Sequence, residues 1–366
     1  MTAPEPEAAK RAGVTGCVDR ATAEVDPRGL AVTYWFDAAS SEAPYSLDVR
    51  FTGTRTGVSG KPEQRDRFEV VEHLEQIPPG SGRVALTSRV LGINPGIWRV
   101  TVAPVKRNAD GANGAQVSTR LPRKVLTATT GYGPLVHGPG VRLVSWPLLV
   151  GLGAVVAILV QVVLAARAGI SVAAVLALSA VGCALGFVGA KTWYLALHRK
   201  PLRSFLTGGA CIQGFLLVAL FVLVIGSAVL GLPVGSLLDA TTPGIFLGMA
   251  VGRPGCFLTG CCAGRPTGSR WGLWSSDRRL ALRRFPVQLV EAAVALLIGV
   301  GALALVLAAE SPAPGAIWAG ALAAYTFVRQ LLFPLRTQSR TRLGRVLTMV
   351  ICGLVLAGAI AVSVAG

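Results

Sequence analysis

Acidic residues are scarce in this 366-residue chain, and most of them lie in its first part. The chain holds 18 Asp and Glu against 35 Lys and Arg. From Leu143 onward, only four acids face 17 basic residues, which leaves a net charge of +13 on that part. The basic residues stand mostly between long apolar runs, and no nucleic-acid-binding motif accompanies them. We therefore expect contact with anionic lipid headgroups and not with nucleic acid.

Histidine is rarer still, with three residues in the whole chain. His73 and His137 are isolated, and His198 is the only histidine after Leu143. The chain also lacks a Ser-His-Asp set, a phosphate-binding P-loop and a zinc-protease motif. These absences argue against the corresponding enzyme classes, and we predict no metal and no cofactor.

Two further absences concern export and disulfides. Residues 1–16 are polar and contain no apolar core, so no secretory signal peptide is predicted. The seven cysteines are odd in number, and four of them lie singly in or beside apolar segments, which is not the pattern of a disulfide scaffold.

Long apolar runs, in contrast, are abundant. Hydrophobic residues make up 52% of the chain and the mean hydropathy is +0.58, which is too apolar for an ordinary soluble enzyme. A membrane-spanning helix needs about 20 apolar residues. Such runs lie roughly at 144–166, 170–197, 208–231, 243–262, 287–309, 313–334 and 346–365. The sequence therefore predicts an all-α bundle of seven transmembrane helices over residues 143–366. No internal repeat supports a repeat-built transporter.

The first part of the chain has the pattern of a small β domain, because short strand-like runs alternate with turn signals. The clearest runs are Ala31–Phe36, Tyr45–Phe51, Phe68–Leu74, Arg83–Val90 and Trp98–Val105. In the second run apolar and polar residues alternate, as expected of a strand with one buried face. We predict an all-β immunoglobulin-like sandwich over residues 17–127, between a disordered segment 1–16 and a linker 128–142.

The segment between residues 252 and 267, GRPGCFLTGCCAGRPT, places arginines, glycines and thiols where a predicted helix meets the headgroups. An arginine near the bilayer is a functional candidate because its burial is costly. Helix counting brings Arg253, Arg265, Arg329 and Arg336 to one membrane face. Converging guanidiniums bind phosphate bidentately and can stabilise a departing phosphate.

Each of these features has a structural alternative. The functional interpretation is favoured for Arg253 and Arg329, which have apolar neighbours. For the basic residues from Arg336 to Arg345, interfacial snorkelling is favoured. The glycines Gly255, Gly260 and Gly264 of this segment would let backbone approach a ligand.

Polar residues in neighbouring runs complete the candidate site. Gln288 and Glu291 are three residues apart and share a helix face, and Glu291 is expected to point into the bundle and pair with Arg253 or Arg329. Asp239 could cap the fourth helix. The segment Thr207, Gly208 and Gly209 opens the third run and allows close packing or close lipid approach.

The thiols of Cys256, Cys261 and Cys262 form a possible thiol site, although their spacing fits no standard zinc pattern. Neighbouring arginines could lower a thiol pKa. Packing as small apolar residues, or a disulfide from Cys256 to Cys261 or Cys262, is the favoured alternative.

Taken in order, these motifs resemble the prolipoprotein diacylglyceryl transferases, bacterial membrane enzymes with the signature G-R-x-G-N-F-x-N-G-E-x-x-G-R-P-T. The later segments 285–291 (FPVQLVE) and 325–336 are similar to the family's H-P-S-Q-L-Y-E and Y-x3-R-x3-E-x2-R. The resemblance implies transfer of a diacylglyceryl group from phosphatidylglycerol to the lipobox cysteine of a prolipoprotein, in the bacterial plasma membrane. It implies a catalytic role for Arg253, Arg329 and Glu291. The residues that it assigns to substrate binding are Arg265, Gly255, Gly260, Gly264, Gln288, Tyr325, Arg336, Thr207, Gly208 and Gly209.

The chain also departs from the family pattern. Cys256 stands for the signature asparagine, Cys261 for its glutamate, Thr207 for a histidine and Phe333 for a later glutamate. These losses favour an alternative function, a non-catalytic phospholipid-binding or partner-docking membrane protein. A thiol-redox membrane protein is a third, weaker hypothesis.

The side of the membrane on which the β domain lies is left open by two opposing predictions. The positive-inside rule places the basic loops and the β domain in the cytoplasm. The family resemblance implies that the same loops face away from it.

Overall fold

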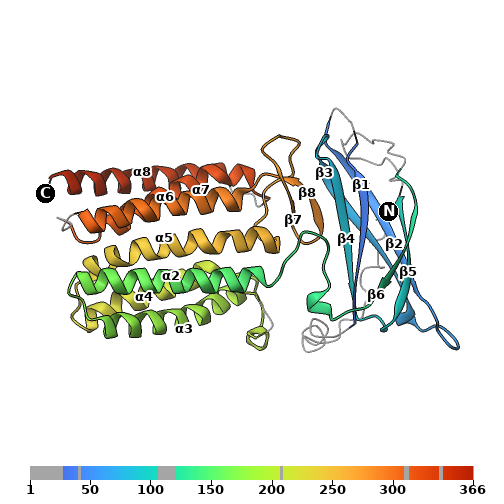
Figure 1. Ribbon diagram of the computed structural model, residues 1–366, viewed down its shortest axis with the longest axis horizontal. Coiled ribbons are helices and arrows are strands. Elements are labelled where there is room, and N and C mark those ends of the chain that lie inside the picture. The colour runs from blue at the N-terminus through green and yellow to red at the C-terminus, as the bar shows by residue number, and fades with distance from the viewer. Residues whose placement is uncertain are drawn as a thin grey trace, which may run out of the picture.

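The computed structural model describes residues 28–39, 43–105, 121–206, 209–308, 313–337 and 341–365. A bundle of long helices carries a β sandwich at one of its ends (Figure 1). The predicted fold class, an all-β part followed by an all-α helical bundle, is therefore confirmed.

The sandwich consists of two four-stranded antiparallel sheets, with strand orders β1-β4-β8-β7 and β3-β2-β5-β6. Two of these strands, β7 (Leu273–Ser276) and β8 (Leu280–Arg284), come from the later part of the chain. Its first six strands are β1 (Gly29–Asp37), β2 (Tyr45–Arg55), β3 (Arg67–Ile77), β4 (Arg83–Leu91), β5 (Ile97–Val105) and β6 (Lys124–Thr129). All five strand-like runs of the sequence are strands in the structure. The sixth, β6, extends into the stretch that was expected to begin a linker.

The core of the sandwich follows from alternation along the strands. In β1, Leu30, Val32, Tyr34 and Phe36 are buried at every second position. They pack with the inward side chains of β2 and β5, including Phe51, into one hydrophobic cluster. Burial of a large apolar side chain contributes about 1.5–3 kcal/mol.

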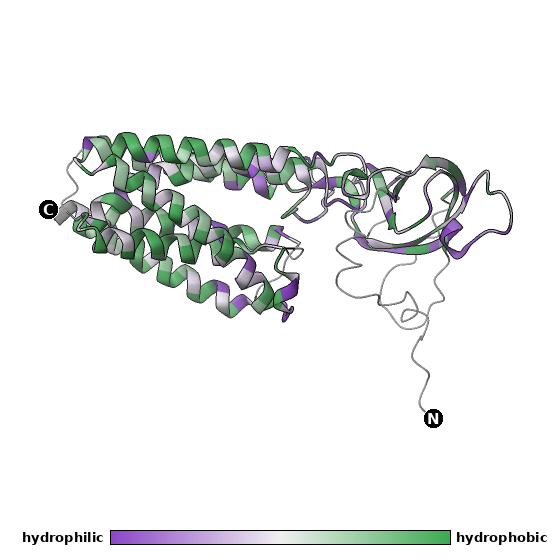
Figure 2. Ribbon diagram, turned by 90° about the horizontal axis from the view of Figure 1, so that it is seen from below, coloured by the Kyte–Doolittle hydropathy of each residue, from purple (hydrophilic) through white to green (hydrophobic). Residues whose placement is uncertain are grey.

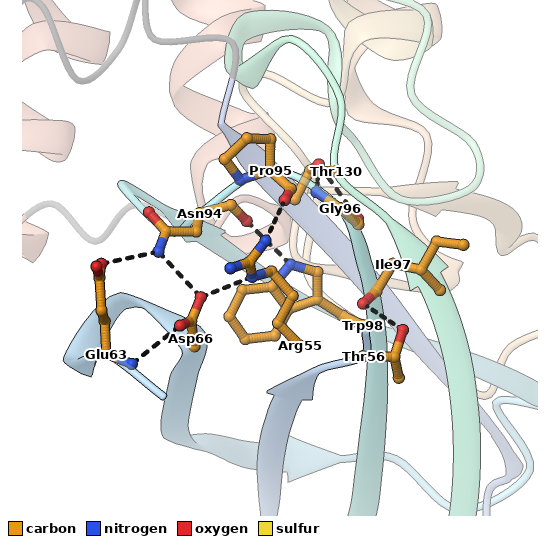
Figure 3. A network of polar contacts seen from close by, with 10 residues as sticks. All are labelled: Arg55, Thr56, Glu63, Asp66, Asn94, Pro95, Gly96, Ile97, Trp98 and Thr130. Atoms are coloured by element: carbon orange, nitrogen blue, oxygen red, sulfur yellow. Dashed lines mark hydrogen bonds and ion pairs between the residues drawn. The ribbon is translucent and has the colours of Figure 1, made fainter. Parts of the chain in front are cut away.

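A buried polar network stabilises the loop between β2 and β3 (Figure 3). Asp66 is 2% exposed and ends the short 3-10 helix η2 (Gln64–Asp66). Its carboxylate accepts hydrogen bonds from Asn94 Nδ2 at 2.9 Å, from the backbone N–H of Glu63 at 2.9 Å and from Arg55 Nε at 2.6 Å. These donors, Asn94 first, lower the pKa of Asp66 to about 2.

The last two strands were not predicted, because they lie in a loop of the helical part. β7 and β8 form a hairpin between the helices α5 (Val234–Thr259) and α6 (Val287–Ala308). β8 pairs with β4, so the hairpin completes the first sheet of the sandwich (Figure 1). Leu280 and Leu282 of β8 belong to the sandwich core.

Seven helices are long and apolar enough to cross a membrane, counting only the described residues. They are α2 (Ser145–Arg167), α3 (Val172–Leu197), α4 (Ile212–Val229), α5 (Val234–Thr259), α6 (Val287–Ala308), α7 (Ala316–Leu332) and α8 (Arg342–Ala365). Hydrophobic residues cover most of their length, and hydrophilic residues gather at the end nearer the sandwich (Figure 2). The seven predicted spans are confirmed.

The fourth helix, however, begins at Val234 and not near residue 243. Its first turns contain Asp239, which was expected to precede the helix, and the polar residues Thr241 and Thr242. Each is buried and satisfied inside the bundle: the two threonine hydroxyls donate to backbone carbonyls one turn earlier, at 2.6 and 2.8 Å.

Close packing of α5 on α2 fixes the centre of the bundle. A Cβ added to Gly248 would lie 2.4 Å from the carbonyl oxygen of Gly153, and one added to Gly244 would lie 2.4 Å from that of Ala157. Small residues let two membrane helices approach to backbone contact. This packing holds α5, whose last turns carry the signature segment.

Candidate functional site

Three helices place polar residues together at the end of the bundle that faces the sandwich. α5 ends there at Thr259 and α6 begins there at Val287. α7 runs into the 3-10 helix η5 (Phe333–Leu335), and Arg336 follows directly. The arrangement confirms that arginines from separate spans reach one face.

Glu291 of α6 lies at the centre of a group that we call the Glu291 cluster, formed by Arg253, Glu291, Arg329 and Arg336. The Glu291 side chain is 1% exposed. Its Oε1 accepts a hydrogen bond from Arg336 Nη1 at 2.7 Å and lies 3.8 Å from Arg329 Nε. Its Oε2 lies 3.1 Å from Arg253 Nη1. The expected pairing of Glu291 with arginines of other spans is present.

The charges of the Glu291 cluster do not balance. Three guanidiniums surround one carboxylate, so two positive charges are in excess. The side chain of Arg336 is 2% exposed, whereas those of Arg253 and Arg329 are 13% and 31% exposed. The buried Nε of Arg336 has no hydrogen-bond partner among the described residues. An anion could approach the two more accessible arginines and receive charge-assisted hydrogen bonds.

The snorkelling interpretation is wrong for Arg336. This residue turns inward because Glu291 supplies its counter-charge, and its guanidinium also lies 5.7 Å from the ring centre of Phe333. Arg345 donates from Nε to the carbonyl of Gln330 at 3.3 Å, and Arg342 is exposed. Arg340 lies outside the described residues.

Three further predicted residues surround the cluster. The hydroxyl of Tyr325, which is buried in α7, accepts a hydrogen bond from Arg253 Nη2 at 3.1 Å. Gln288 is also buried and donates from Nε2 to the carbonyl of Cys261 at 2.9 Å. Arg265 is exposed, and its Nε donates to the carbonyl of Arg336 at 2.9 Å. Their assignment to substrate binding stays a prediction.

The signature glycines are explained by contacts within the protein. A Cβ at Gly255 would lie 3.0 Å from the carbonyl oxygen of Ser145 in α2. Gly260 caps α5 with a φ of 75°, and its Cβ would lie 2.6 Å from the carbonyl oxygen of Ser276. At Gly264 the corresponding distance, to the carbonyl oxygen of Phe285, would be 2.0 Å. Protein backbone therefore occupies the space that we expected a ligand to approach.

The three signature cysteines are free thiols beside the cluster. The Cys261 thiol donates to the carbonyl of Cys256 at 3.7 Å. Cys262 is exposed and has a φ of 54°, in the left-handed region. A hydrogen bond from Cys261, followed by the charges of Arg336 and Arg253, lowers the pKa of Cys262 to about 6. The same sulfur contacts raise the pKa of Cys261. The described residues contain neither a disulfide between these cysteines nor a group suited to hold a metal ion.

The other predicted positions lie elsewhere or are not described. Thr207 and Gly208 lie outside the described residues. Gly209 packs against the ring of Tyr194, where a Cβ would lie 2.8 Å from a ring atom. Asp239 does not cap its own helix: it accepts backbone hydrogen bonds from Gly315 at 2.7 Å and Trp318 at 2.9 Å, and so caps α7.

Arg284 is a residue of this region that the sequence analysis missed. It lies between two of the predicted membrane spans, where an exposed loop residue would be expected, but it is 1% exposed. Its Nη1 donates to the carbonyl of Gly264 at 3.1 Å, and its Nη2 lies 2.5 Å from Asp277 Oδ2. The available signal was alternation, since Leu280, Leu282 and Arg284 occupy every second position of β8 and share its inner face.

Comparison with known proteins gives one consistent family. Residues 135–364 match the family model of prolipoprotein diacylglyceryl transferase. The match begins after β6, leaving β1 to β6 outside it, and includes the hairpin and all seven helices. The matching family and the seven apolar helices together indicate a bacterial multi-pass membrane protein.

Individual relatives match over shorter stretches. The phosphatidylglycerol–prolipoprotein diacylglyceryl transferase of Chloroflexus aggregans is 34% identical over 99 residues, covering 25% of this chain and 32% of that protein. The enzyme of the same name from Clostridium tetani is 27% identical over 139 residues, covering 35% and 54%. That of Dehalococcoides mccartyi is 60% identical over 35 residues, covering 10% and 14%. The chain thus spans between 14% and 54% of the length of these curated relatives.

Proposed function

The chain belongs to the prolipoprotein diacylglyceryl transferase family, and from this premise we propose that it transfers a diacylglyceryl group from phosphatidylglycerol to the lipobox cysteine of a prolipoprotein. The observation that carries the proposal is the Glu291 cluster, in which three guanidiniums share one buried carboxylate. The cluster lies at an end of the helix bundle, where lipid headgroups meet it.

The charge balance of the reaction matches the charge of the cluster. The acceptor thiolate attacks the glyceryl carbon that carries the phosphate ester, so a C–S bond forms as the C–O bond breaks. The bonding electrons leave with glycerol phosphate, and the phosphate goes from one negative charge to two. The two excess positive charges of the cluster stabilise this developing charge more than they stabilise the bound lipid, as catalysis requires.

The residues have separate tasks in this proposal. Arg253 and Arg329, the more accessible guanidiniums, bind the phosphate and stabilise the leaving group. Glu291 holds the cluster together, because its carboxylate lies within 3.8 Å of all three guanidiniums. Arg265 assists from the exposed edge, and Tyr325 orients Arg253.

The proposal is tested by replacing Arg253 with Ala and following labelled phosphatidylglycerol to a lipobox peptide. Loss of such an electrostatic contact is expected to lower transfer by about 100-fold or more. Arg345→Ala is the matched control, because Arg345 contacts a backbone carbonyl of α7 and not Glu291. Unchanged transfer in Arg253→Ala would refute the assignment.

A second candidate function is supported by the replaced family positions. Cys256, Cys261 and Phe333 stand where the family pattern has an asparagine and two glutamates. On this alternative the chain binds anionic phospholipid without transferring it, and the β sandwich docks a partner. Complementation of a bacterial strain that lacks the transferase separates the two functions, with Arg253→Ala as the control. Rescue of growth by the wild-type chain but not by Arg253→Ala favours the enzyme.

A further inference from the structure

The β7–β8 hairpin joins the sandwich to the helical part through main-chain pairing. Ala85 and Leu86 of β4 pair with Ala281 and Leu280 of β8. The backbone N–H of Thr87 adds a hydrogen bond to the carbonyl of Arg279 at 2.8 Å. The hairpin is therefore held by the sandwich although it belongs, in sequence, to the loop between two membrane helices.

Aromatic and charged side chains strengthen the same junction. The rings of Trp35 in β1 and Trp274 in β7 stack with centres 5.9 Å apart. Trp274 also donates from Nε1 to the carbonyl of Arg83 at 3.0 Å. Arg279 lies 3.5 Å from Glu72 of β3. The hairpin is thus fixed to both sheets of the sandwich.

On its other side, the hairpin donates hydrogen bonds to the segment that follows α5 at two points. Arg278 donates from Nε to the carbonyl of Thr259 at 3.1 Å, at the end of α5. Arg284 donates from Nη1 to the carbonyl of Gly264 at 3.1 Å. These two carbonyls bracket the loop 260–263, which contains two of the signature cysteines.

The second of these hydrogen bonds, from Arg284 to Gly264, connects to the Glu291 cluster. Gly264 forms an antiparallel bridge with Arg336. The adjacent backbone N–H of Arg265 donates to the carbonyl of Leu335 at 2.8 Å. Arg336 in turn donates to Glu291 at 2.7 Å. A continuous series of contacts therefore runs from β4 through β8, Arg284 and the 264–265 segment to the cluster.

Arg284 is chemically suited to this link. It is 1% exposed, and Asp277 on the turn of the same hairpin balances its charge at 2.5 Å. Its Nη2 also donates to the carbonyl of Leu280 at 3.1 Å. The guanidinium of Arg284 is buried while Asp277 is 35% exposed, so removing Asp277 would leave a buried charge without its counter-charge.

We propose that Arg284 is a positioning residue of the transferase site: anchored by the β sandwich, it holds the 264–265 segment and thereby fixes Arg336 in the Glu291 cluster. The sandwich is on this view part of the site's scaffold, although six of its strands, β1 to β6, lie outside the residues that match the family. The catalytic consequence rests on the proposed function, whereas the positioning itself does not.

The test compares Arg284→Met with Arg283→Met in the full-length chain. Arg283 is the neighbouring residue of β8 and is exposed, so its replacement is the matched control. Hydrogen–deuterium exchange of peptides covering 260–267 reports the Arg265 amide without requiring any activity. Arg284→Met is expected to raise exchange in these peptides by roughly tenfold and Arg283→Met to leave it unchanged. Equal exchange in the two variants overturns the proposal.

Two milder substitutions keep the test decisive if Arg284→Met fails to fold. Asp277→Asn keeps an oxygen for the turn but removes the counter-charge of Arg284, and Trp274→Ala removes the Trp35 stack at an exposed position. Both are expected to raise exchange at 260–267, by less than Arg284→Met. If exchange at 260–267 rises in neither variant, the anchoring role of the sandwich is overturned.

Transfer assays on the same variants separate the two proposals. If the wild-type chain transfers lipid, Arg284→Met should lower kcat more than it raises KM, with partial rescue by Arg284→Lys. A fall in transfer without rescue, at unchanged exchange, counts against positioning. If the wild-type chain transfers nothing while exchange responds as expected, the proposed function fails and the positioning role of Arg284 stands.

Discussion

Two buried carboxylates, one in each part of the molecule, meet arginine in different ways. Asp66 in the sandwich faces one guanidinium, that of Arg55, and receives two neutral N–H donors. Glu291 in the helix bundle faces three guanidiniums and receives one short hydrogen bond, from Arg336. The Asp66–Arg55 pair is electrically balanced, whereas the Glu291 cluster carries two excess positive charges.

The difference separates a group that stabilises a fold from one prepared for a ligand. A balanced, fully hydrogen-bonded pair gains nothing from a further anion. An excess of guanidinium at a membrane edge is destabilising by itself, and an anionic headgroup relieves it. The following predictions test this contrast, from the largest expected effect to the smallest.

Removal of the Glu291 charge should have the largest effect on stability. Glu291→Gln leaves three close guanidiniums without a counter-charge, which we expect to lower the free energy of unfolding by about 3–5 kcal/mol. Thermal unfolding in neutral detergent micelles measures this change. Adding phosphatidylglycerol should raise the unfolding midpoint of Glu291→Gln more than that of the wild type, because the phosphate replaces the lost charge. An equal rise in both proteins would show that the lipid does not bind at the cluster.

Replacement of Arg329 should affect function more than stability. Its side chain is 31% exposed, and its Nε lies as far as 3.8 Å from Glu291 Oε1, so this ion pair is the weakest of the three. The variant Arg329→Ala should therefore fold normally. We expect transfer of labelled diacylglyceryl to fall by about 100-fold, which corresponds to about 2.7 kcal/mol. Arg55→Ala in the Asp66 network is the opposite control, with lower thermal stability and unchanged transfer. The contrast between the two clusters fails if Arg55→Ala reduces transfer as much as Arg329→Ala.

Acidification should remove the stability that the charge of Asp66 contributes to the sandwich. The pKa of Asp66 is about 2 in the folded chain, below the value of about 3.9 for a free Asp side chain. The charge of Asp66 therefore contributes stability above about pH 4, and this contribution is lost as the pH falls toward 2. Asp66→Asn should lower the thermal midpoint at neutral pH and weaken its decline between about pH 4 and pH 2. Circular dichroism of the sheets measures both, and an unaltered acid profile would contradict the structural role of Asp66.

The sequence predicted most of the fold because local patterns determine it. Strand-like runs between turn signals, with alternation in β2, predicted five strands, and the length of the seven apolar runs predicted all seven helices. Arginine residues in apolar contexts, such as Arg253 and Arg329, correctly indicated that separate spans converge. The beginning of α5 was missed because Asp239 and its neighbours satisfy their polar groups inside the bundle.

The non-local parts of the site could not be read in the same way. β8 is a strand because β4 offers it an edge, and no pattern within residues 273–284 identifies that partner. The inward position of Arg336 depends on Glu291, which is 45 residues away in sequence. If its partner is not known, an arginine at a helix end is equally compatible with the membrane interface and with a buried position. An arginine in a loop is equally compatible with solvent and with a buried position.

The smallest expected effect lies at Cys262, an exposed thiol whose pKa is lowered by a hydrogen bond from Cys261 and then by the charges of Arg336 and Arg253. The pKa of Cys262 is about 6, so the thiolate should already predominate at neutral pH. Alkylation at Cys262, followed by mass spectrometry across about pH 5 to pH 9, should therefore reach half its maximal rate near pH 6, whereas an ordinary thiol does so near 8.5. Glutathione in the same sample supplies that reference. Arg253→Gln should move the midpoint upward because it removes one of the nearby positive charges, and Arg55→Gln should leave it unchanged. An unchanged midpoint in Arg253→Gln would mean that the positive charge of the cluster does not act on Cys262, which would remove the contrast with Asp66.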